Sequence, residues 1–399
     1  MVTLYDVAQR AGVSIATVSR VLHGHDRVRE PTRARVRAAI EELGYVPDGA
    51  AQSLARSRKD VIGLVCVEHA GIDLRQYDSE AMSMLFYDGV LRGVESRLRH
   101  GQSTWSLLLT FLPEDEARGV AQPDGEPVAS RLLALSGKAD GLLIGEGVVP
   151  PPVLAQLARR LPVVAVAGDP AQRGVDVVAA DNWSGSQALI EHLVTEHGAR
   201  RLFHVDGPAS APDAAVRREA MQAVVGEHPG VRVTGRYSGR FSFHSGEAAA
   251  AILLEQARRD GGMPDAVVCS NDQMAIGLLR ALAEAGVRVP RDTAVVGFDD
   301  IFPASLCDPP LTTVHQPFRE LGERACDRLI ERIAHPALRR KVELLPAELV
   351  LRSSCGCPPG ASERRAVAHR GFGPGAGAAS PRPPPPPGET RRPKSKKPD

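Results

Sequence analysis

A short stretch near the start of the chain, GVSIATVSRVLH (residues 12–23), combines small apolar side chains with one arginine. Val18, Val21 and Leu22 lie at positions i, i+3 and i+4, so they predict the buried stripe of a short helix. The residues left on the outward side are Ile15, Ala16, Ser19 and Arg20. An apolar pair that faces outward at the start of a helix needs a partner, either a neighbouring helix or another molecule.

The major groove of DNA is a partner that fits these side chains. Thymine presents a methyl group that Ile15 or Ala16 can cover, and guanine presents O6 and N7, which Arg20 can bind with two hydrogen bonds. The hydroxyl groups of Thr17 and Ser19, with the amino end of the helix, suit phosphates. The alternative for Ile15 is packing on the adjacent helix. The whole set predicts a helix that reads base edges.

Local signals predict a second helix just before this one. Thr3 and Asp6 form a capping-box pattern at its start, and Gly12 ends it after about residue 11. Ser14 can cap the next helix, which runs over residues 15–23. The two short helices are therefore expected to be joined by a turn of about three residues that contains glycine.

A third helix is expected after residue 30. Pro31 lies in its first turn, where the missing N–H does no harm, and Gly44 stops it. The common core of the three helices is expected to contain Leu4, Val7, Val18, Val21, Leu22, Val36, Ile40 and Leu43.

From Val61 the pattern changes to apolar runs that alternate with helical stretches. The runs that predict strands are VIGLVCV, SLLLTF, ADGLLIG, PVVAVAG, RRLFHVDG, DAVVCS and TAVVGFDD. Strands of this kind between helices indicate parallel βαβ units and an α/β fold. Because roughly 300 residues exceed one ordinary doubly wound core, two lobes with a cleft between them are expected.

Composition limits the class of protein. The chain has 399 residues, of which 43% are hydrophobic and 24% charged, so it is expected to be soluble and to contain two or three domains. It shows no run of about 18 apolar residues and no signal-peptide core, which predicts a cytoplasmic protein without membrane contact. Basic residues outnumber acidic ones by 10 to 7 in residues 1–60, whereas they number 30 against 38 in residues 61–360. A mildly basic start is compatible with phosphate contacts and equally with a solvated charged face.

The cysteines give no clear sign of a disulfide or metal site. There are six, at positions 66, 269, 307, 326, 355 and 357, and most lie in apolar contexts. The SCGC segment at 354–357 could bind a metal, but we find no second Cys/His pair at zinc spacing to complete it. Reduced thiols, no metal and no cofactor are therefore expected.

Several long segments resemble one family of bacterial regulators. TLYDVAQRAGVSIATVSRVLHGHDRV and TRARVRAAIEELGYVP resemble the DNA-binding headpiece of the lactose-repressor (LacI/GalR) family. GVDVVAADNWSG, VVCSNDQMAIGLLRALAEAGVRVP, AVVGFDDIFPASLCDPPLTTVHQPFRELG and LPAELVLRSSCGC resemble the effector-binding domain of that family, in order and spacing. The resemblance covers residues 3 to about 357.

The resemblance implies a transcriptional regulator, expected to be a repressor, that binds double-stranded DNA. It implies a homodimer on a pseudo-palindromic operator, with a periplasmic-binding-protein-like type I fold behind each helix-turn-helix headpiece. Ile15, Ala16 and Arg20 match positions that read the operator half-site. Within AAQSLA, Leu54 matches the wedge that enters the minor groove at the operator centre, and Ala51 lets two hinge helices approach closely.

For the cleft, the resemblance implies binding of a small-molecule effector, a sugar or related metabolite. The positions that match effector-binding residues are Asp169, Arg217, Phe241, Asn271 and Asp299. Carboxylates, a guanidinium and an amide suit hydroxyl groups, and an aromatic face suits the apolar side of a sugar ring. Each of four residues also has a purely structural alternative: Arg217 as a surface residue, Phe241 as ordinary core, Asn271 as a helix cap, and Asp299 as a structural residue.

The implied organisation has four parts. They are the headpiece at 1–46, a hinge helix and linker at 47–60, a two-lobed effector-binding and dimerisation domain at 61–357, and a disordered Pro/Arg/Lys-rich tail at 358–399. One departure concerns Arg29, which stands where the family usually has a serine cap for the third helix.

Two other classes of protein can be built on an α/β domain of this kind. A sugar-binding protein without a regulatory role would share the cleft. An enzyme on the same scaffold is not expected, because the chain has no G-x-S-x-G, Walker A or H-E-x-x-H motif.

Overall fold

The structure is a computed structural model of the 399-residue chain. It describes residues 2–22, 28–45, 58–68, 84–99, 105–113, 128–145, 148–167, 174–209, 211–358 and 364–367. The hinge segment 48–56 and the tail beyond 367 lie outside the described residues.

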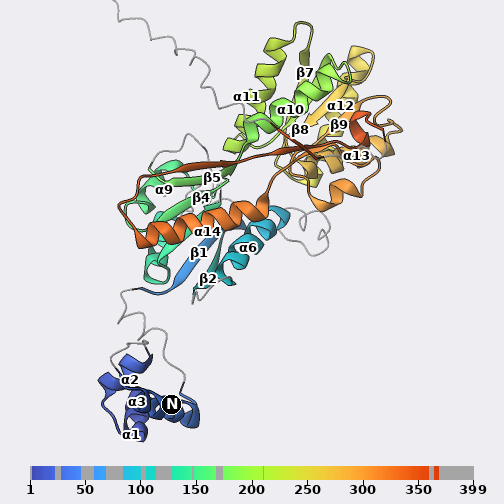
Figure 1. The fold of residues 1–399 in the computed structure, drawn as a ribbon. Helices are drawn as coiled ribbons and strands as arrows, with labels where there is room; N and C mark the ends of the chain where they lie inside the picture. Colours follow the sequence, from blue (N-terminus) through green and yellow to red (C-terminus); the bar gives the residue numbers. More distant parts are fainter. Residues whose placement is uncertain are drawn as a thin grey trace, which may run out of the picture.

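Three helices at the amino-terminal end form a small unit (Figure 1). They are α1 (Leu4–Ala11), α2 (Ile15–Leu22) and α3 (Glu30–Leu43). The predicted capping box is present at α1: the Asp6 amide donates to the Thr3 hydroxyl, and the Thr3 amide donates to the Asp6 carboxylate. Gly12, with φ of 63°, ends α1, and the Ser14 hydroxyl accepts from the Thr17 amide at the start of α2.

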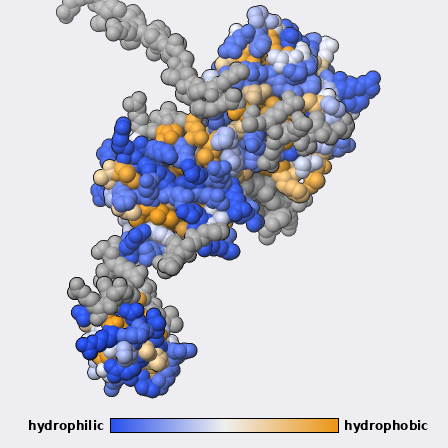
Figure 2. Space-filling view, in the orientation of Figure 1, coloured by the Kyte–Doolittle hydropathy of each residue, from blue (hydrophilic) through white to orange (hydrophobic). Residues whose placement is uncertain are grey.

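The core of this helical unit confirms the prediction. All eight expected residues are either buried in it or packed against it, and Ala8, Ala11, Ala39 and Tyr45 join them. Gly44, with φ of 59°, ends α3 as expected, and Arg29 precedes α3 without a side-chain capping bond. Figure 2 shows mainly hydrophilic surface on the face of the unit turned to the viewer, with small hydrophobic spots.

The next part of the chain builds a first α/β lobe. Its six-stranded sheet is entirely parallel and has the order β11-β5-β4-β3-β1-β2. Its strands are β1 (Val61–Glu68), β2 (Ser106–Pro113), β3 (Gly141–Gly145), β4 (Val163–Val166), β5 (Asp176–Ala180) and β11 (Val342–Leu345). One face is covered by α6 (Met84–Arg99) and α14 (Phe318–Ala334), and the other by α8 (Val128–Ala134) and α9 (Pro151–Leu157). A short turn, η3 (Leu135–Gly137), follows α8.

A second lobe contains a four-stranded parallel sheet of order β7-β6-β8-β9. Its strands are β6 (Arg201–Asp206), β7 (Arg232–Ser238), β8 (Ala266–Cys269) and β9 (Ala294–Val296). Helices α10 (Asn182–Thr195) and α11 (Pro212–Glu227) share a buried core with one face. Helices α12 (Phe243–Asp260) and α13 (Asp272–Glu284) share one with the other face.

Beside this sheet lies a small antiparallel sheet of order β10-β12-β13. Its strands are β10 (Thr313–His315), β12 (Glu348–Val350) and β13 (Arg364–Ala366), and the short turns η4 (Phe302–Ser305) and η5 (Ser353–Cys355) lie nearby in sequence. Strand β13 corrects one expectation, because the tail was expected to be disordered from residue 358. Main-chain pairing with the edge of β12 orders these three residues without any need for an apolar core.

The chain crosses between the lobes three times. It passes from β5 directly into α10, from β10 into α14, and from β11 into β12. Figure 1 shows α14 lying along the first lobe although the elements before it belong to the second. The two-lobed α/β fold expected from the sequence is therefore confirmed, and each lobe is assembled from separated segments of chain.

A buried ion pair holds the segment from α14 to β11 on the first lobe. Asp176, at the start of β5, is fully buried and accepts hydrogen bonds from Arg332 (Nε to Oδ2, 2.8 Å) and Arg328 (Nε to Oδ1, 2.8 Å) of α14. The Lys341 amide, just before β11, donates to the same carboxylate at 2.8 Å. Burial alone would raise the pKa of Asp176, but these hydrogen bonds and the Arg328 charge hold it below its usual value.

None of the helices among the described residues combines the length and apolar character that a membrane crossing requires.

Candidate functional site

The outward face of α2 carries the residues that the sequence places there. Ile15 is 48% exposed and is not one of the residues that form the core of the helical unit or pack against it. Ala16 and Arg20 are also exposed, whereas Val18 between them is fully buried. The helix therefore presents two small apolar groups in its first turn and one guanidinium a turn later.

The hydroxyl groups of the same helix are partly engaged. The Thr17 hydroxyl lies 2.9 Å from that of Ser14, and both Thr17 and Ser19 are half-buried. Arg20 forms no ion pair with any of the described residues, so its donors can reach an external acceptor. Ala51 and Leu54, the expected minor-groove residues, lie outside the described residues.

The second group of predicted residues follows the strands of the second lobe. All strands of its sheet are parallel, and β10 runs alongside β9 through the parallel bridges Val296 to Thr312 and Asp299 to His315. Since β10 continues into α14 of the first lobe, the carboxyl ends of these strands lie on the side of the first lobe. In parallel α/β sheets, ligands gather at such edges.

Arg217 of α11 is buried, with 5% of its surface exposed, so the reading as a surface arginine is wrong. Its Nε donates to Oδ1 of Asn182 at 2.9 Å, and its other nitrogens contact the Ser270 carbonyl and the Asp213 carboxylate. The guanidinium also lies over the ring of Phe298, 3.9 Å from its centre. This network holds the charge of Arg217 in a fixed place.

Asp299 follows β9 and lies close to this guanidinium. Its Oδ1 is 3.7 Å from Nη1 of Arg217 and accepts a hydrogen bond of 2.7 Å from the side-chain amide of Gln316. Burial raises the pKa of Asp299 to about 7, although Arg217 and the Gln316 hydrogen bond act to lower it. The carboxyl group can therefore change protonation near neutral pH.

Asn271 and Phe241 have structural roles at the same edge. Oδ1 of Asn271 accepts from the Met274 amide at 3.0 Å and caps α13, which was one of the open readings. Its Nδ2 donates to the carbonyl of Phe241 at 3.0 Å. The Phe241 ring packs against the second-lobe core and lies so close to Gly207 that a Cβ there would come within 2.5 Å of it.

Backbone strain collects at the strand ends. Five described non-glycine residues have positive φ angles, and four of them follow strands: Ala167 after β4 (56°), Phe241 after β7 (60°), and Asp299 and Asp300 after β9 (122° and 57°). The fifth, Asp60, precedes β1. Such conformations are costly and are found at ligand clamps more often than elsewhere. Asp169, the fifth predicted effector residue, lies outside the described residues.

Two residues at the chain crossings belong to this network and were not predicted. Asn182 begins α10 directly after the first crossing, and Gln316 lies at the second crossing between β10 and α14. They contact Arg217 and Asp299 respectively. The sequence did carry a signal for Asn182: it lies two residues after the mostly apolar run VDVVAA, where a strand would end.

Comparison with known proteins places both parts of the chain. Residues 3–48 match the family described as bacterial regulatory proteins, lacI family, and residues 190–355 match a periplasmic binding protein-like domain. The ribose operon repressor of Escherichia coli (strain K12) is 35% identical over 353 residues, which cover 87% of this chain and 98% of that protein. The HTH-type transcriptional regulator CelR of Thermobifida fusca is 33% identical over 358 residues, covering 88% and 98%.

Solved structures agree with this relationship. A crystal structure of the lac repressor dimer bound to operator and the anti-inducer ONPF has a TM-score of 0.74 and 28% identity, and the match covers 89% of this chain and 99% of that chain. A transcriptional regulator CelR-cellobiose complex has a TM-score of 0.61 and 30% identity, covering 89% and 100%. From its headpiece, its two-lobed domain and these relatives, the chain belongs to the lacI family of bacterial regulatory proteins.

Proposed function

We propose that this protein is a transcriptional repressor whose affinity for operator DNA is controlled by a small molecule bound between its two lobes. The observation that carries the proposal is the outward face of α2, where Ile15, Ala16 and Arg20 are exposed on a folded three-helix unit. A short helix with this face suits the major groove, because it offers a methyl contact and a bidentate guanine contact one turn apart.

The proposed form on DNA is a homodimer on a pseudo-palindromic operator. One headpiece is too small for tight specific binding, and two-fold symmetry gives two half-sites about one helical turn apart. The relative solved as a dimer on its operator supports this arrangement. Leu54 is proposed to enter the minor groove between the half-sites, with Ala51 at the contact of the two hinges. Such a protein works on the chromosome, in the cytoplasm.

For the effector we propose a carbohydrate or a closely related metabolite. Arg217 and Asp299 offer a fixed guanidinium and a carboxyl group at the edge between the lobes, and both suit hydroxyl groups. The names of two relatives refer to ribose and cellobiose, which makes these two sugars the first probes. Asp169, Phe241 and Asn271 complete the proposed set.

DNA binding is tested with three purified proteins: the wild type, Arg20→Ala and Arg37→Ala. Arg37 is an exposed arginine of α3 and serves as the matched control. Gel shifts use the DNA upstream of the protein's own gene over a range of salt concentrations. Wild type and Arg37→Ala are expected to bind tightly, whereas Arg20→Ala loses about 1–3 kcal/mol and relaxes base choice at one position in each half-site.

If all three proteins bind this DNA and random DNA equally, the proposal is wrong. A protein that binds a sugar but shows no specific DNA binding would be a sugar-binding protein without a regulatory role. The same preparations are screened for hydrolysis of glycosides, where no turnover is expected.

Effector binding is tested by calorimetry with ribose and cellobiose. Asp299→Asn is expected to weaken binding of the active sugar and to reduce its influence on operator affinity, while operator binding without sugar is kept. Asp292→Asn, at a partly exposed position of the same lobe, is the control and should change neither. Unchanged sugar affinity in Asp299→Asn would remove this residue from the effector site.

A further inference from the structure

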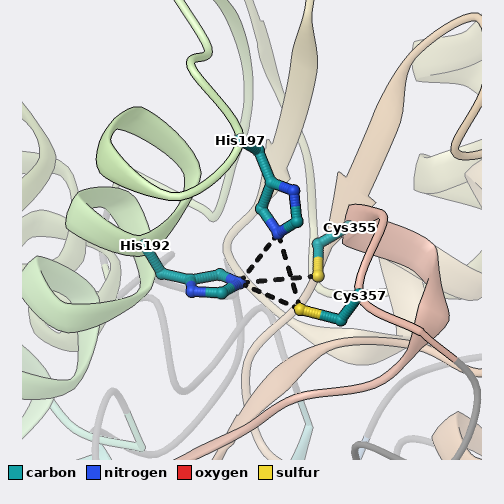
Figure 3. A group of neighbouring side chains, drawn as sticks. All are labelled: His192, His197, Cys355 and Cys357. Carbon is teal, nitrogen blue, oxygen red and sulfur yellow. Dashed lines mark hydrogen bonds between the residues drawn. The ribbon is translucent and has the colours of Figure 1, made fainter.

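Four potential metal ligands meet at the carboxyl end of α10, away from the strand ends described above. They are His192 of α10, His197 in the turn after it, Cys355 of η5 and Cys357 just beyond it. Figure 3 shows all four side chains pointing toward a common centre, the histidines from one segment and the cysteines from the other. One ligand atom from each residue lies within 4.8 Å of every other.

The separations fit a tetrahedral metal site. Zinc bonds of about 2.0–2.1 Å to nitrogen and 2.3 Å to sulfur place nitrogen and sulfur atoms about 3.5 Å apart in a tetrahedron. In this structure Nε2 of His192 is 3.6 Å from the sulfur of Cys355 and 3.5 Å from that of Cys357. Nε2 of His197 is 3.5 Å from the Cys357 sulfur as well.

The two Nε2 atoms are 3.0 Å apart, which is about 0.3 Å closer than a tetrahedral zinc site with such bonds would place them. A small rotation of either ring removes this difference. Two nitrogen and two sulfur ligands in a tetrahedron are one of the usual donor sets of structural zinc sites.

The local sequence brings each pair of ligands together. His192 and His197 have four residues between them, which lies within the spacing of histidine pairs in structural zinc sites. The two cysteines have only one residue between them, and Gly356, with φ of 107°, makes the tight turn that lets both sulfurs face the same point. A side chain at Gly356 would also come within 3.2 Å of the His197 ring.

The surroundings favour a structural site. His192 and Cys355 are buried, and His197 and Cys357 are half-buried. The Thr312 hydroxyl lies 3.1 Å from the Cys355 sulfur, where it can donate to a thiolate and orient it. Because all four positions of a tetrahedron would be filled by protein, no place remains for a reacting water.

We propose that His192, His197, Cys355 and Cys357 bind one zinc ion that joins the end of α10 to the segment after η5. The two histidines precede the SCGC segment by more than 150 residues, so the pairing could not be predicted from local spacing. The inference does not depend on the proposed effector or operator.

The metal is measured in full-length protein purified without a polyhistidine tag. Elemental analysis is expected to find about one zinc ion per chain in the wild type. Cys357→Ser and His197→Ala are each expected to lose most of it. Cys307→Ser is the matched control, because Cys307 is a half-buried thiol of the same lobe whose sulfur lies 3.3 Å from the main-chain carbonyls of Ala304 and Pro309.

Cobalt substitution gives a readout of ligand type. Metal-free wild type and Cys307→Ser, titrated with Co²⁺, are expected to show saturable tetrahedral bands and sulfur-to-cobalt charge-transfer absorption. The charge-transfer absorption falls in Cys357→Ser. A chelator should lower the melting temperature of wild type and Cys307→Ser but leave that of His197→Ala unchanged.

The proposal is overturned if wild type and Cys357→Ser carry the same amount of metal, since that metal would then be adventitious. It is also overturned if the metal-free wild type shows no saturable binding of Zn²⁺ or Co²⁺ under reducing conditions. In that case the four side chains form a hydrogen-bonded cluster only.

Discussion

The side-chain amide of Gln316 donates a hydrogen bond of 2.7 Å to the carboxyl group of Asp299. Two main-chain bonds run beside it: the Asp299 amide donates to the Val314 carbonyl at 2.8 Å, and the Gln316 amide donates to the Asp299 carbonyl at 3.3 Å. Asp299 is therefore fastened to the segment that leads from β10 into α14. A ligand that moves this carboxyl group acts directly on a connection between the lobes.

Gln316→Leu should weaken the coupling between effector and operator. The substitution removes one of the groups that join Asp299 to the crossing, so the effect of the sugar on operator affinity should fall by about 1 kcal/mol. Operator binding without sugar should stay close to wild type. Gel shifts with and without the active sugar measure this coupling. The control is Gln256→Leu: the Gln256 side-chain amide donates to the Thr234 carbonyl at the edge strand β7, away from the three crossings, so this change should leave the coupling intact.

Effector affinity should rise with pH through about 7. Sugar hydroxyls that donate to the ionised carboxylate of Asp299 favour its charged form, so binding releases a proton below the pKa of about 7. Calorimetry in buffers with different ionisation enthalpies measures this release.

The contribution of Asp299 to the free energy of unfolding changes with pH in the opposite direction. The folded pKa of Asp299 is raised, so its favourable contribution is complete at acid pH and is lost as pH rises through about 7.

Asp299→Asn should abolish the pH dependence of sugar binding. An unchanged pH profile of sugar affinity in the variant would assign the titration to another group.

Ile15 should contribute a contact with a thymine methyl group. Replacing thymine by deoxyuracil, one operator position at a time, removes that methyl and should weaken wild-type binding at one or two positions in each half-site. Ile15→Ala should weaken binding to the thymine operator and become less sensitive to the same replacement. If Ile15→Ala stays as sensitive as wild type at every position, another residue covers the methyl group.

Leu54→Ala should reduce operator binding far more than binding to random DNA. A side chain inserted between base steps bends the duplex, at a cost on the order of 1–6 kcal/mol that only a deformable sequence keeps small. Loss of the wedge should also reduce operator bending, measured by fluorescence energy transfer between labelled DNA ends. Equal losses on operator and random DNA would contradict this role.

Asp176→Asn should destabilise the first lobe strongly. It leaves the buried guanidinium of Arg332 without its carboxylate, and breaking a buried pair in this way costs about 3–5 kcal/mol. Because the folded pKa of Asp176 is lowered, its contribution is complete above the unfolded pKa and is lost as pH falls through the folded value.

Urea unfolding between pH 3 and pH 7 tests this prediction for Asp176. Asp292→Asn, which weakens a more exposed pair with Arg288, should destabilise the protein much less. Equal stability of the two variants near neutral pH would show that the buried pair contributes little.

Features that depend on residues close together in the sequence could be predicted more readily than features that depend on distant ones. The ends of α1 and α2 were predictable because capping by Thr3 and Ser14 is a local effect. Strand β7 (Arg232–Ser238) was not predicted: its half-exposed sequence RVTGRYS lacks the continuous apolar run of a central strand, and it lies at the edge of its sheet.

The candidate sites also differ in whether they depend on local spacing or on residues far apart in the sequence. Exposure of Ile15 and Arg20 follows from helical spacing alone. The burial of Arg217 depends on Asn182, which is 35 residues distant in sequence, and the Cys355 sulfur meets a histidine 163 residues before it. Such pairings become visible only when the chain is folded.

The three crossings also set an order of completion while the chain is being synthesised. The first lobe begins to emerge from the ribosome at β1, yet it lacks α14 and β11 until the four-stranded sheet of the second lobe has been made. During that time the carboxylate of Asp176 cannot form its ion pair with Arg332, which follows 156 residues later. The second lobe has its four-stranded sheet and the helices on both its faces before the first lobe can close. The first lobe, whose first strand is translated before any strand of the second lobe, is thus completed only after the four-stranded sheet of the second lobe has been made.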